Sequence, residues 1–239
     1  MSESLITDLD QFSSFNDFFI RRLRPGVRPL PSDSAAIVCP ADGYISELGK
    51  IEQGRLLQAK GRYYELNDLF GGNAALAQPF KNGQFFTVYL APKNYHRVHI
   101  PVKGILRQML HIPGELFSVN NTCVQSIPKL FARNERVICL FETDLGSMAV
   151  IFVGALLIGS VVTRWHGPVM PARGQPLAKI YNDPSLIFQA GDELGYFQWG
   201  STVIILFQSD GVSWLSSLHS GDPVLMGQAI ANIFNFGAN

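Results

Sequence analysis

The chain has 239 residues, of which 47% are hydrophobic, 11% are aromatic and only 16% are charged. A typical soluble domain is roughly 25% charged, and disordered or coiled-coil chains are more polar still, so both of those classes are excluded. Nineteen basic and nineteen acidic residues give a formal net charge of zero. The uniform positive field that nucleic-acid binding normally uses is therefore missing, and we expect no nucleic-acid partner.

The charge is unevenly distributed along the chain. Residues 180–239 contain five acidic residues and no Lys or Arg, so the remainder is net basic. Three widely spaced cysteines, Cys39, Cys123 and Cys139, form no disulfide framework or Cys-x-x-Cys pair, which suits a reducing compartment. The first twelve residues are polar and acidic, so we expect no secretory signal.

The N-terminal segment, residues 1–35, is predicted to be amphipathic and close to a membrane. Ser14 to Asp17 is typical of a capping box that starts a helix. An aromatic and aliphatic face follows, and then arginines closed by prolines: Phe15, Phe18, Phe19 and Leu23, then Arg21, Arg22, Arg24 and Arg28. Such a helix suits anionic lipid; the alternative is a short helix packed on its own domain with solvated arginines.

Residues 36–239 are predicted to form the catalytic body, a mainly β (α+β) domain. A single β-rich sandwich or barrel-like unit with short peripheral helices is expected, because apolar runs alternate with Gly, Pro, Asn and Asp turns. One short helix is predicted at 64–70. The predicted strands are 43–48, 84–90, 104–111, 136–142, 149–153, 157–162 and 202–207.

One apolar stretch, residues 145–163, also fits a membrane span. It has nineteen uncharged residues, close to the ~20 that a transmembrane helix needs. Gly146, Gly154 and Gly159 interrupt it, however, and Val, Ile and Phe dominate between them. Buried strands are therefore the favoured interpretation.

Two short motifs contain residue types suited to acid–base chemistry. Asp42 stands in a Pro-Ala-Asp-Gly turn, where Asp before Gly is common turn chemistry in its own right. His96 and His99 lie three residues apart in Tyr-His-Arg-Val-His-Ile-Pro. On a strand their side chains would point to opposite faces. No third ligand has a matching spacing, so we expect no metal and assign the imidazoles to proton transfer.

The Gly200-Ser201 bond is the third candidate. It is not a Gly-x-Ser-x-Gly elbow, because Val203 stands at the last position. Glycine permits a strained turn, and a serine hydroxyl after it can attack the preceding carbonyl, moving the acyl group from nitrogen to oxygen. An aspartate and a histidine would orient and deprotonate that serine. The alternative is an ordinary strand opening with small polar residues.

Taken together, these motifs resemble the phosphatidylserine decarboxylases, close to the bacterial form. The likeness covers nearly the whole chain. In order it includes Phe15-Asn-Asp-Phe-Phe, Pro40-Ala-Asp-Gly, Gln58-Ala-Lys-Gly, Tyr95-His-Arg-Val-His-Ile-Pro, Pro113-Gly-Glu-Leu-Phe-Ser-Val-Asn, Leu130-Phe-Ala-Arg-Asn-Glu-Arg-Val and Gly200-Ser-Thr-Val-Ile.

The resemblance implies a proenzyme that cleaves itself between Gly200 and Ser201. Asp42, His99 and Ser201 correspond to the charge relay of this cleavage, and His96 to the histidine that acts in decarboxylation, as the acid that protonates the product. Ser201 would become a pyruvoyl group. Its carbonyl would form a Schiff base with the substrate amine and accept electrons as CO2 leaves, so that neither pyridoxal phosphate nor a metal is needed.

The resemblance also implies the partners. A large chain, 1–200, and a small chain, 201–239, would remain together and form a homodimer. The enzyme would lie peripherally on the cytoplasmic face of a bacterial cell membrane, converting phosphatidylserine in an anionic membrane to phosphatidylethanolamine. Arg97 and the arginines of 21–28 are candidates for phosphodiester contact, although surface solvation is the expected role of most of them.

Two departures from the family pattern affect these expectations. Trp199 replaces a small or medium aliphatic residue, so the rate of processing is expected to differ. Only fourteen residues precede Phe15; either the sequence is truncated there, or the Phe/Arg helix alone attaches the chain, more weakly. Two alternatives remain: a hydrolase that uses Asp42, His99 and Ser201 without cleavage, and a lipoyl-like β-rich binding or carrier module.

Overall fold

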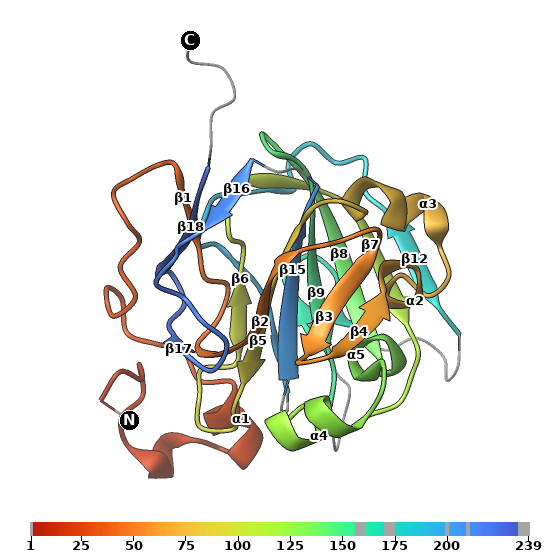
Figure 1. Ribbon diagram of the computed structural model, residues 1–239. Helices are drawn as coiled ribbons and strands as arrows, with labels where there is room; N and C mark the ends of the chain where they lie inside the picture. Colours follow the sequence, from red (N-terminus) through yellow and green to blue (C-terminus); the bar gives the residue numbers. More distant parts are fainter. Residues whose placement is uncertain (1, 156–160, 170–174, 199–200, 209–210, 234–239) are drawn as a thin grey trace.

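A computed structural model shows antiparallel sheets stacked face to face, with short helices at the periphery (Figure 1). The structure describes residues 2–155, 161–169, 175–198, 201–208 and 211–233. The predicted mainly β fold with peripheral helices is confirmed. The described sheets are open and packed on one another, so the sandwich is the correct form of that prediction.

A nine-stranded sheet forms the centre of the molecule. Its central strands are buried on both faces, which explains why β9 and β15 are almost continuous runs of apolar residues. In spatial order the strands are β12 (Leu177–Ile180), β7 (Gly104–Ile112), β8 (Arg136–Thr143), β9 (Gly146–Val153), β15 (Ser201–Phe207), β5 (Gln84–Leu90), β2 (Gly43–Lys50) and β17 (Pro223–Val224), and β13 (Ile187–Phe188) also pairs with β7.

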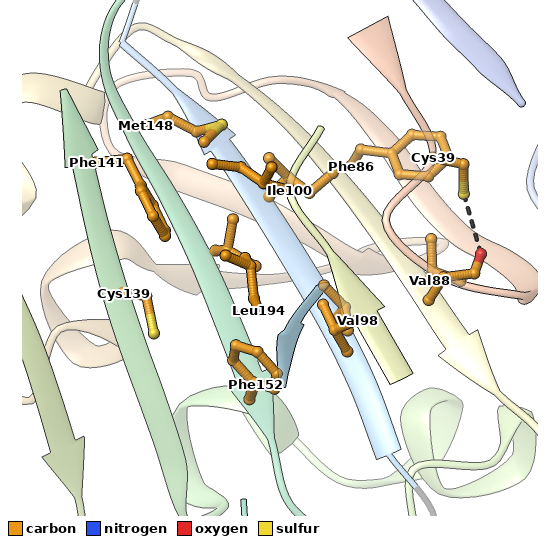
Figure 2. Packing of buried hydrophobic residues seen from close by; sticks show 14 of the residues in the cluster. Cys39, Phe86, Val88, Val98, Ile100, Cys139, Phe141, Met148, Phe152 and Leu194 are labelled. Atoms are coloured by element: carbon orange, nitrogen blue, oxygen red, sulfur yellow. Dashed lines mark hydrogen bonds between the residues drawn. The ribbon is translucent and has the colours of Figure 1, made fainter. Parts of the chain in front are cut away.

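The molecule has two hydrophobic cores, one on each face of the central sheet. Two smaller sheets pack on one face and enclose the first core. Figure 2 shows Val98 and Leu194 of a small sheet near Phe152 of the central one. The small sheets are β11 (Gly167–Val169), β10 (Val161–Thr163), β14 (Glu193–Phe197) and β6 (Arg97–His99), and β1 (Ala36–Val38), β18 (Ala229–Ile233) and β16 (Val212–Trp214).

A hairpin and short helices cover the opposite face and enclose the second core. Gln58 of the hairpin is buried and fastens this layer, because its amide donates to the carbonyls of Val124 (2.7 Å) and Ile127 (2.8 Å) and accepts from Leu130 N (2.7 Å). The elements are β3 (Arg55–Ala59), β4 (Arg62–Glu65), α2 (Leu66–Leu69), α3 (Ala74–Ala77), η2 (Gln78–Phe80), α4 (Asn121–Ser126) and α5 (Leu130–Arg133).

The N-terminal segment packs along the small sheet that contains β6. After the short turn η1 (Leu9–Gln11), helix α1 (Phe15–Phe19) begins as predicted, with the Ser14 hydroxyl accepting from Asp17 N at 3.1 Å. The helix ends at Phe19, so Leu23 does not extend its apolar face, contrary to expectation. The carbonyl of Ile20, just past the end, accepts from Arg97 Nε at 2.9 Å. The domain boundary at residue 35 stays a prediction.

The predicted strands and the predicted helix at 64–70 are mostly confirmed, with two differences. The helix predicted at 64–70 is shorter, because Tyr64 and Glu65 belong to strand β4, where Tyr64 is buried. The strand predicted at 157–162 lies mainly outside the described residues, and its last two positions begin β10. The apolar stretch 145–163 contains β9 and β10, and no helix in the described part of the chain is long and apolar enough to cross a membrane.

Candidate active site

The central sheet brings the Asp42 motif and Ser201 to one edge. Tyr44 of β2 is paired with Tyr89 of β5, which is paired in turn with Thr202 of β15. Strand β2 therefore begins where β5 ends and β15 begins. Asp42, just before β2, and Ser201, the first residue of β15, lie at this same end of the sheet.

Gly43 permits the close approach that sets the position of Asp42. A Cβ atom at residue 43 would lie 2.3 Å from the carbonyl oxygen of Tyr89, which is backbone and cannot move aside. Only glycine leaves room for β2 to start against β5. The Pro-Ala-Asp-Gly motif thus has a packing reason in addition to its turn chemistry.

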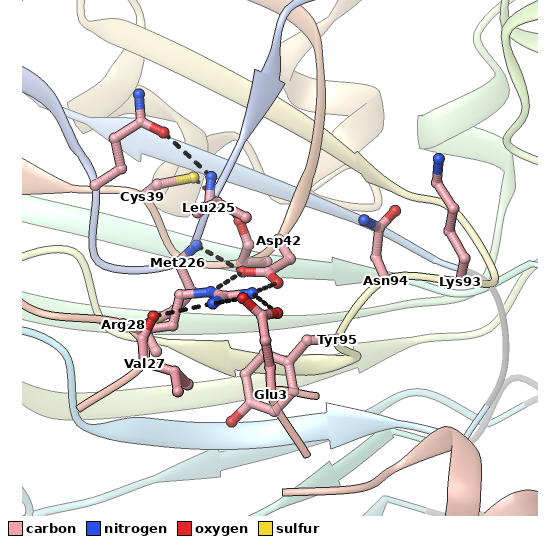
Figure 3. A network of polar contacts seen from close by, with 12 residues as sticks. Glu3, Val27, Arg28, Cys39, Asp42, Lys93, Asn94, Tyr95, Leu225 and Met226 are labelled. Carbon is pink, nitrogen blue, oxygen red and sulfur yellow. Dashed lines mark hydrogen bonds and ion pairs between the residues drawn. The ribbon is translucent and has the colours of Figure 1, made fainter. Parts of the chain in front are cut away.

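Asp42 is buried and bonded to Arg28 (Figure 3). Arg28 Nε and Nη2 donate to the two carboxylate oxygens at 3.0 and 2.6 Å, and Met226 N donates to Oδ1 at 2.8 Å. The same guanidinium binds both oxygens of Glu3, at 2.9 and 2.8 Å. These two carboxylates raise the pKa of Arg28 above its usual range. A cavity of about 320 Å³ lies beside this network, and Tyr95 is among the residues that line it.

His99 is buried on β6, near Asp42 but not bonded to it. Its Nδ1 lies 2.7 Å from the Gly191 carbonyl and must donate to it, so the lone pair is on Nε2, where the Tyr95 hydroxyl donates at 3.0 Å. Burial lowers the pKa of His99, and the Gly191 carbonyl, Glu193 and Asp42 oppose this only in part. His99 is therefore neutral near pH 7, with its basic nitrogen held by Tyr95.

His96 lies close to the start of β15. Its Nδ1 donates to the Asn94 carbonyl at 2.9 Å, so its lone pair is on Nε2, which is buried and has no hydrogen-bond partner among the described residues. Burial lowers the pKa of His96 to about 4, although the carbonyls of Asn94 and Leu90 raise it. Leu90 is the strand partner of Ser201. The ring of Phe19, 3.8 Å away between centroids, packs on His96.

The Ser201 hydroxyl, like His96 Nε2, is buried and has no hydrogen-bond partner among the described residues. The whole Ser201 side chain is buried. Val203 and Ile205 of β15 point into the first core, so alternation along the strand places Ser201 on that side. A buried unpaired hydroxyl costs about 1–3 kcal/mol, so a native structure keeps one only for a reason.

The two histidines point to opposite faces of the small sheet. Val98 points into the first core, so His96 shares that side with Ser201, while His99 lies on the outer side with Tyr95. Among the described residues no hydrogen bond joins Asp42 to His99 or His99 to Ser201. Residues 199 and 200 lie outside the description, so the assigned roles of Asp42, His96, His99 and Ser201, and of Gly200, stay predictions.

Sequence reasoning missed the contacts that Arg28 and Tyr95 make with predicted residues, and that of Glu3 with Arg28. Arg28 was expected to be solvated, but its side chain is only 6% exposed and it holds Asp42; Arg97 is likewise buried, in an ion pair of 2.7 Å with Glu193. Glu3 and Tyr95 were not considered. Tyr95 adjoins His96 in the motif, which was an available signal, whereas no spacing rule links Arg28 to Asp42.

Comparisons with known proteins agree with the motifs at this edge. A profile of the phosphatidylserine decarboxylase family matches residues 15–232. A phosphatidylserine decarboxylase proenzyme of Pseudomonas putida is 50% identical over 234 residues, 97% of this chain and 82% of the relative. One of Acidovorax ebreus is 49% identical over 233 residues, with the same shares of the two chains. Similarity of this extent, over a chain that keeps the Asp42, His96, His99 and Ser201 motifs in order, makes it a member of the phosphatidylserine decarboxylase family.

Proposed function

We propose that this protein converts phosphatidylserine to phosphatidylethanolamine and CO2, and that it generates its own catalytic group by cleavage before Ser201. The observation that carries the proposal is the buried, unpaired hydroxyl of Ser201 at the start of β15, on the side of the sheet where His96 Nε2 is also buried and unpaired. Family membership supplies the substrate class.

Self-cleavage begins with an attack by Ser201 Oγ on the carbonyl carbon of residue 200. The hydroxyl proton passes to a base, the C–N bond breaks, and an ester and a free amine result. Loss of the proton from Cα of residue 201 expels the carboxylate of residue 200 and leaves a dehydroalanine. Its imine tautomer takes up water and releases ammonia, which leaves a pyruvoyl group at the new N-terminus.

The first proton transfer is assigned to His99, with Asp42 as its neighbour. His99 corresponds to the family's relay base. Its side chain lies on the outer side of the small sheet and Ser201 on the core side, so this role needs a rearrangement in which His99 Nε2 exchanges the Tyr95 hydroxyl for that of Ser201. Its Nδ1 is already fixed by the Gly191 carbonyl, which keeps the lone pair on Nε2. Asp42 is held by Arg28 and Met226 N. While it keeps these partners it would influence His99 only through its charge, which raises the pKa of His99.

Ser201 is the chain's own source of the pyruvoyl group, and its buried orphan hydroxyl fits that conversion. The group supplies a carbonyl that binds the substrate amine covalently and withdraws the electron pair of the bond to CO2. The final proton transfer is assigned to His96. Its Nε2 lone pair can take up a proton and deliver it to the carbon that CO2 has left, and the lowered pKa makes the protonated form a strong donor.

We also propose a peripheral position on the cytoplasmic face of the membrane, and a homodimer of the two-chain unit. Leu5, Leu9 and Phe15 are large apolar side chains exposed on the N-terminal segment, which supports contact with lipid. Homodimerisation rests on the family alone, and sedimentation of the purified protein in detergent tests it.

Intact mass under denaturing conditions tests the proposed function. We expect two chains, 1–200 and 201–239, the smaller lighter than its encoded mass by one ammonia. Ser201→Ala should give one uncleaved chain without decarboxylase activity. A wild-type chain that stays whole, and whose Ser201 reacts with a fluorophosphonate, would instead indicate a hydrolase.

A further inference from the structure

Tyr95 occupies the basic nitrogen of His99. Its hydroxyl lies 3.0 Å from His99 Nε2, and the two rings are 5.7 Å apart between centroids. Because the Gly191 carbonyl accepts from Nδ1 at 2.7 Å, Nε2 carries the lone pair and the Tyr95 hydroxyl is the donor. Burial and the charge of Glu193 raise the pKa of Tyr95, so this hydroxyl keeps its proton near pH 7. While Tyr95 stays in place, His99 cannot take a proton from another hydroxyl.

The bond between Tyr95 and His99 is shielded from water. Tyr95 is only 6% exposed and His99 only 7% exposed. At a surface, water would replace either partner and the bond would have little influence on the imidazole. In a buried site a hydrogen bond is stronger, and a partner that leaves finds no water to replace it. Any process that needs His99 Nε2 must therefore first separate it from the Tyr95 hydroxyl.

The backbone on both sides of Tyr95 is fixed by hydrogen bonds. Asn94 closes a turn with Ala91, because its N–H donates to the Ala91 carbonyl at 2.8 Å and its side chain accepts from Ala91 N at 2.9 Å. On the other side, the carbonyl of His96 accepts from Phe197 N at 3.1 Å. Rotation of the Tyr95 ring about its own side-chain bonds is therefore the motion that frees His99, and the surrounding segment keeps its position.

Two cavities beside the Tyr95 ring provide the space for that rotation. One, of about 460 Å³, lies on the outer side of the small sheet and is also lined by Arg97. The other, of about 320 Å³, is also lined by Glu3 and Asp42, which Figure 3 shows beside Tyr95. A close-packed aromatic ring could not turn without displacing its neighbours. The hydroxyl of Tyr95 can leave His99 without any change in the strands.

We propose that Tyr95 is a positioning residue of self-cleavage, which holds His99 on the outer side of the small sheet and thereby limits the rate at which the chain is cut. The inference rests on the proposed function and adds a control of the same site. When the ring turns away, the Tyr95 hydroxyl keeps its proton, and the lone pair of His99 Nε2 becomes free. The imidazole is then able to move and to accept the proton of the Ser201 hydroxyl.

Tyr95→Phe tests the proposal, because it removes the hydroxyl and keeps the ring. Full chains are made by cell-free translation with a pulse of label, and the cut fraction is followed over time on denaturing gels. Tyr64→Phe is the matched control, since the Tyr64 hydroxyl is buried without a partner among the described residues, in the hairpin over the other face of the central sheet. A neutral hydrogen bond changes an equilibrium by a factor of about two to ten. We expect Tyr95→Phe to be cut faster than the parent by about that factor, and Tyr64→Phe at the parent's rate. Cleavage of Tyr95→Phe at or below the parent's rate would overturn the proposal.

The pH dependence of cleavage separates this role from a merely structural one. His99 must be neutral to accept a proton, so the cleavage rate falls as the pH drops through its pKa. Burial lowers the pKa of His99, and a donor to its neutral nitrogen lowers that pKa further. Tyr95→Phe should therefore move the falling limb to higher pH. The charges that act on His99, those of Glu193, Arg97 and Asp42, are the same in both chains. A limb that does not move would contradict the proposal.

The Ser201→Ala chain allows the contact to be measured without cleavage. NMR titration of the histidine rings, with the His99 signal identified by its loss in His99→Gln, should give a higher pKa for His99 in Tyr95→Phe than in the parent. An equal or lower pKa would show that the hydroxyl does not hold Nε2, and would overturn the proposal; Tyr95→Met provides the same comparison if Tyr95→Phe does not fold. Failure of the proposed function has a different signature, because the wild-type chain would then stay whole while the titration still gave the expected result.

Discussion

Replacing Arg28 with glutamine should destabilise the fold far more than replacing the neighbouring Glu3. Arg28 binds both oxygens of Asp42, at 2.6 and 3.0 Å. The two side chains are only 6% and 5% exposed, so water cannot replace the lost contact. In Arg28→Gln the carboxylate keeps the Met226 N–H but loses its opposite charge.

The magnitude follows from burial. Removing one partner of a buried ion pair typically costs about 3–5 kcal/mol, because the other charge stays buried without compensation. The pair between Arg28 and Glu3 is different, because Glu3 is 53% exposed. An exposed pair contributes only about 0–1 kcal/mol. We expect a loss of about 3 kcal/mol or more for Arg28→Gln and less than about 1 kcal/mol for Glu3→Gln.

Urea unfolding measures the difference. The Ser201→Ala background keeps the chain in one piece, so that a two-state analysis applies. Asp42→Asn combined with Arg28→Gln completes a double-mutant cycle, in which the coupling energy should account for most of the single loss. In the chain that keeps Ser201, Arg28→Gln should slow self-cleavage, and Arg28→Lys should restore part of the cleavage rate. Equal destabilisation by Arg28→Gln and Glu3→Gln would refute the reasoning.

Three further predictions concern the same edge of the sheet. Burial lowers the pKa of His96 from 6.5 to about 4, so the unfolded chain binds this proton more tightly than the folded one. The free energy of unfolding should therefore fall by up to about 3 kcal/mol as the pH drops from 6.5 towards 4. Urea unfolding at several pH values measures this slope, which His96→Gln should flatten; an unchanged slope would contradict the prediction. His99→Ala should prevent cleavage, whereas His96→Ala should permit cleavage but abolish decarboxylation; mass spectrometry and CO2 release would show the reverse if His96 were the cleavage base. Gly43→Ala should cost about 1–3 kcal/mol by overpacking, since its Cβ would lie 2.3 Å from the Tyr89 carbonyl oxygen; a urea midpoint like the parent's would contradict this.

The sequence predicted most strands because their pattern is local. Strands β9 and β15 are apolar runs bounded by glycine or polar residues, and both proved to be central strands buried on two faces. The elements that depend on distant contacts were wrong in detail. Tyr64 was assigned to a helix but lies in β4, where its ring packs on Phe131 at 5.9 Å between centroids. Helix α1 ends at Phe19. The carbonyl of Ile20 accepts a hydrogen bond from Arg97, which is far along the chain.

For the candidate site, motifs identified residues but not their partners. Asp42 and Ser201 were found because their local sequences are distinctive, and the sheet register then places them at one edge. The contacts of Asp42 depend on Arg28 and Met226, which belong to the N-terminal segment and to the segment between β17 and β18. No local pattern contains such information, because the ion pair exists only after both segments pack on the sheet.

The placement of the two histidines explains how one short motif could serve two reactions. Three residues apart on extended chain, they point to opposite sides, so each has its own surroundings. Both are neutral with the lone pair on Nε2, because a carbonyl fixes each Nδ1–H. His99 Nε2 already accepts from Tyr95, whereas His96 Nε2 is unpaired among the described residues. A base that is occupied until a partner moves suits an event that happens once in the life of the chain. A base that is left free beside residue 201 suits a reaction that repeats at every turnover.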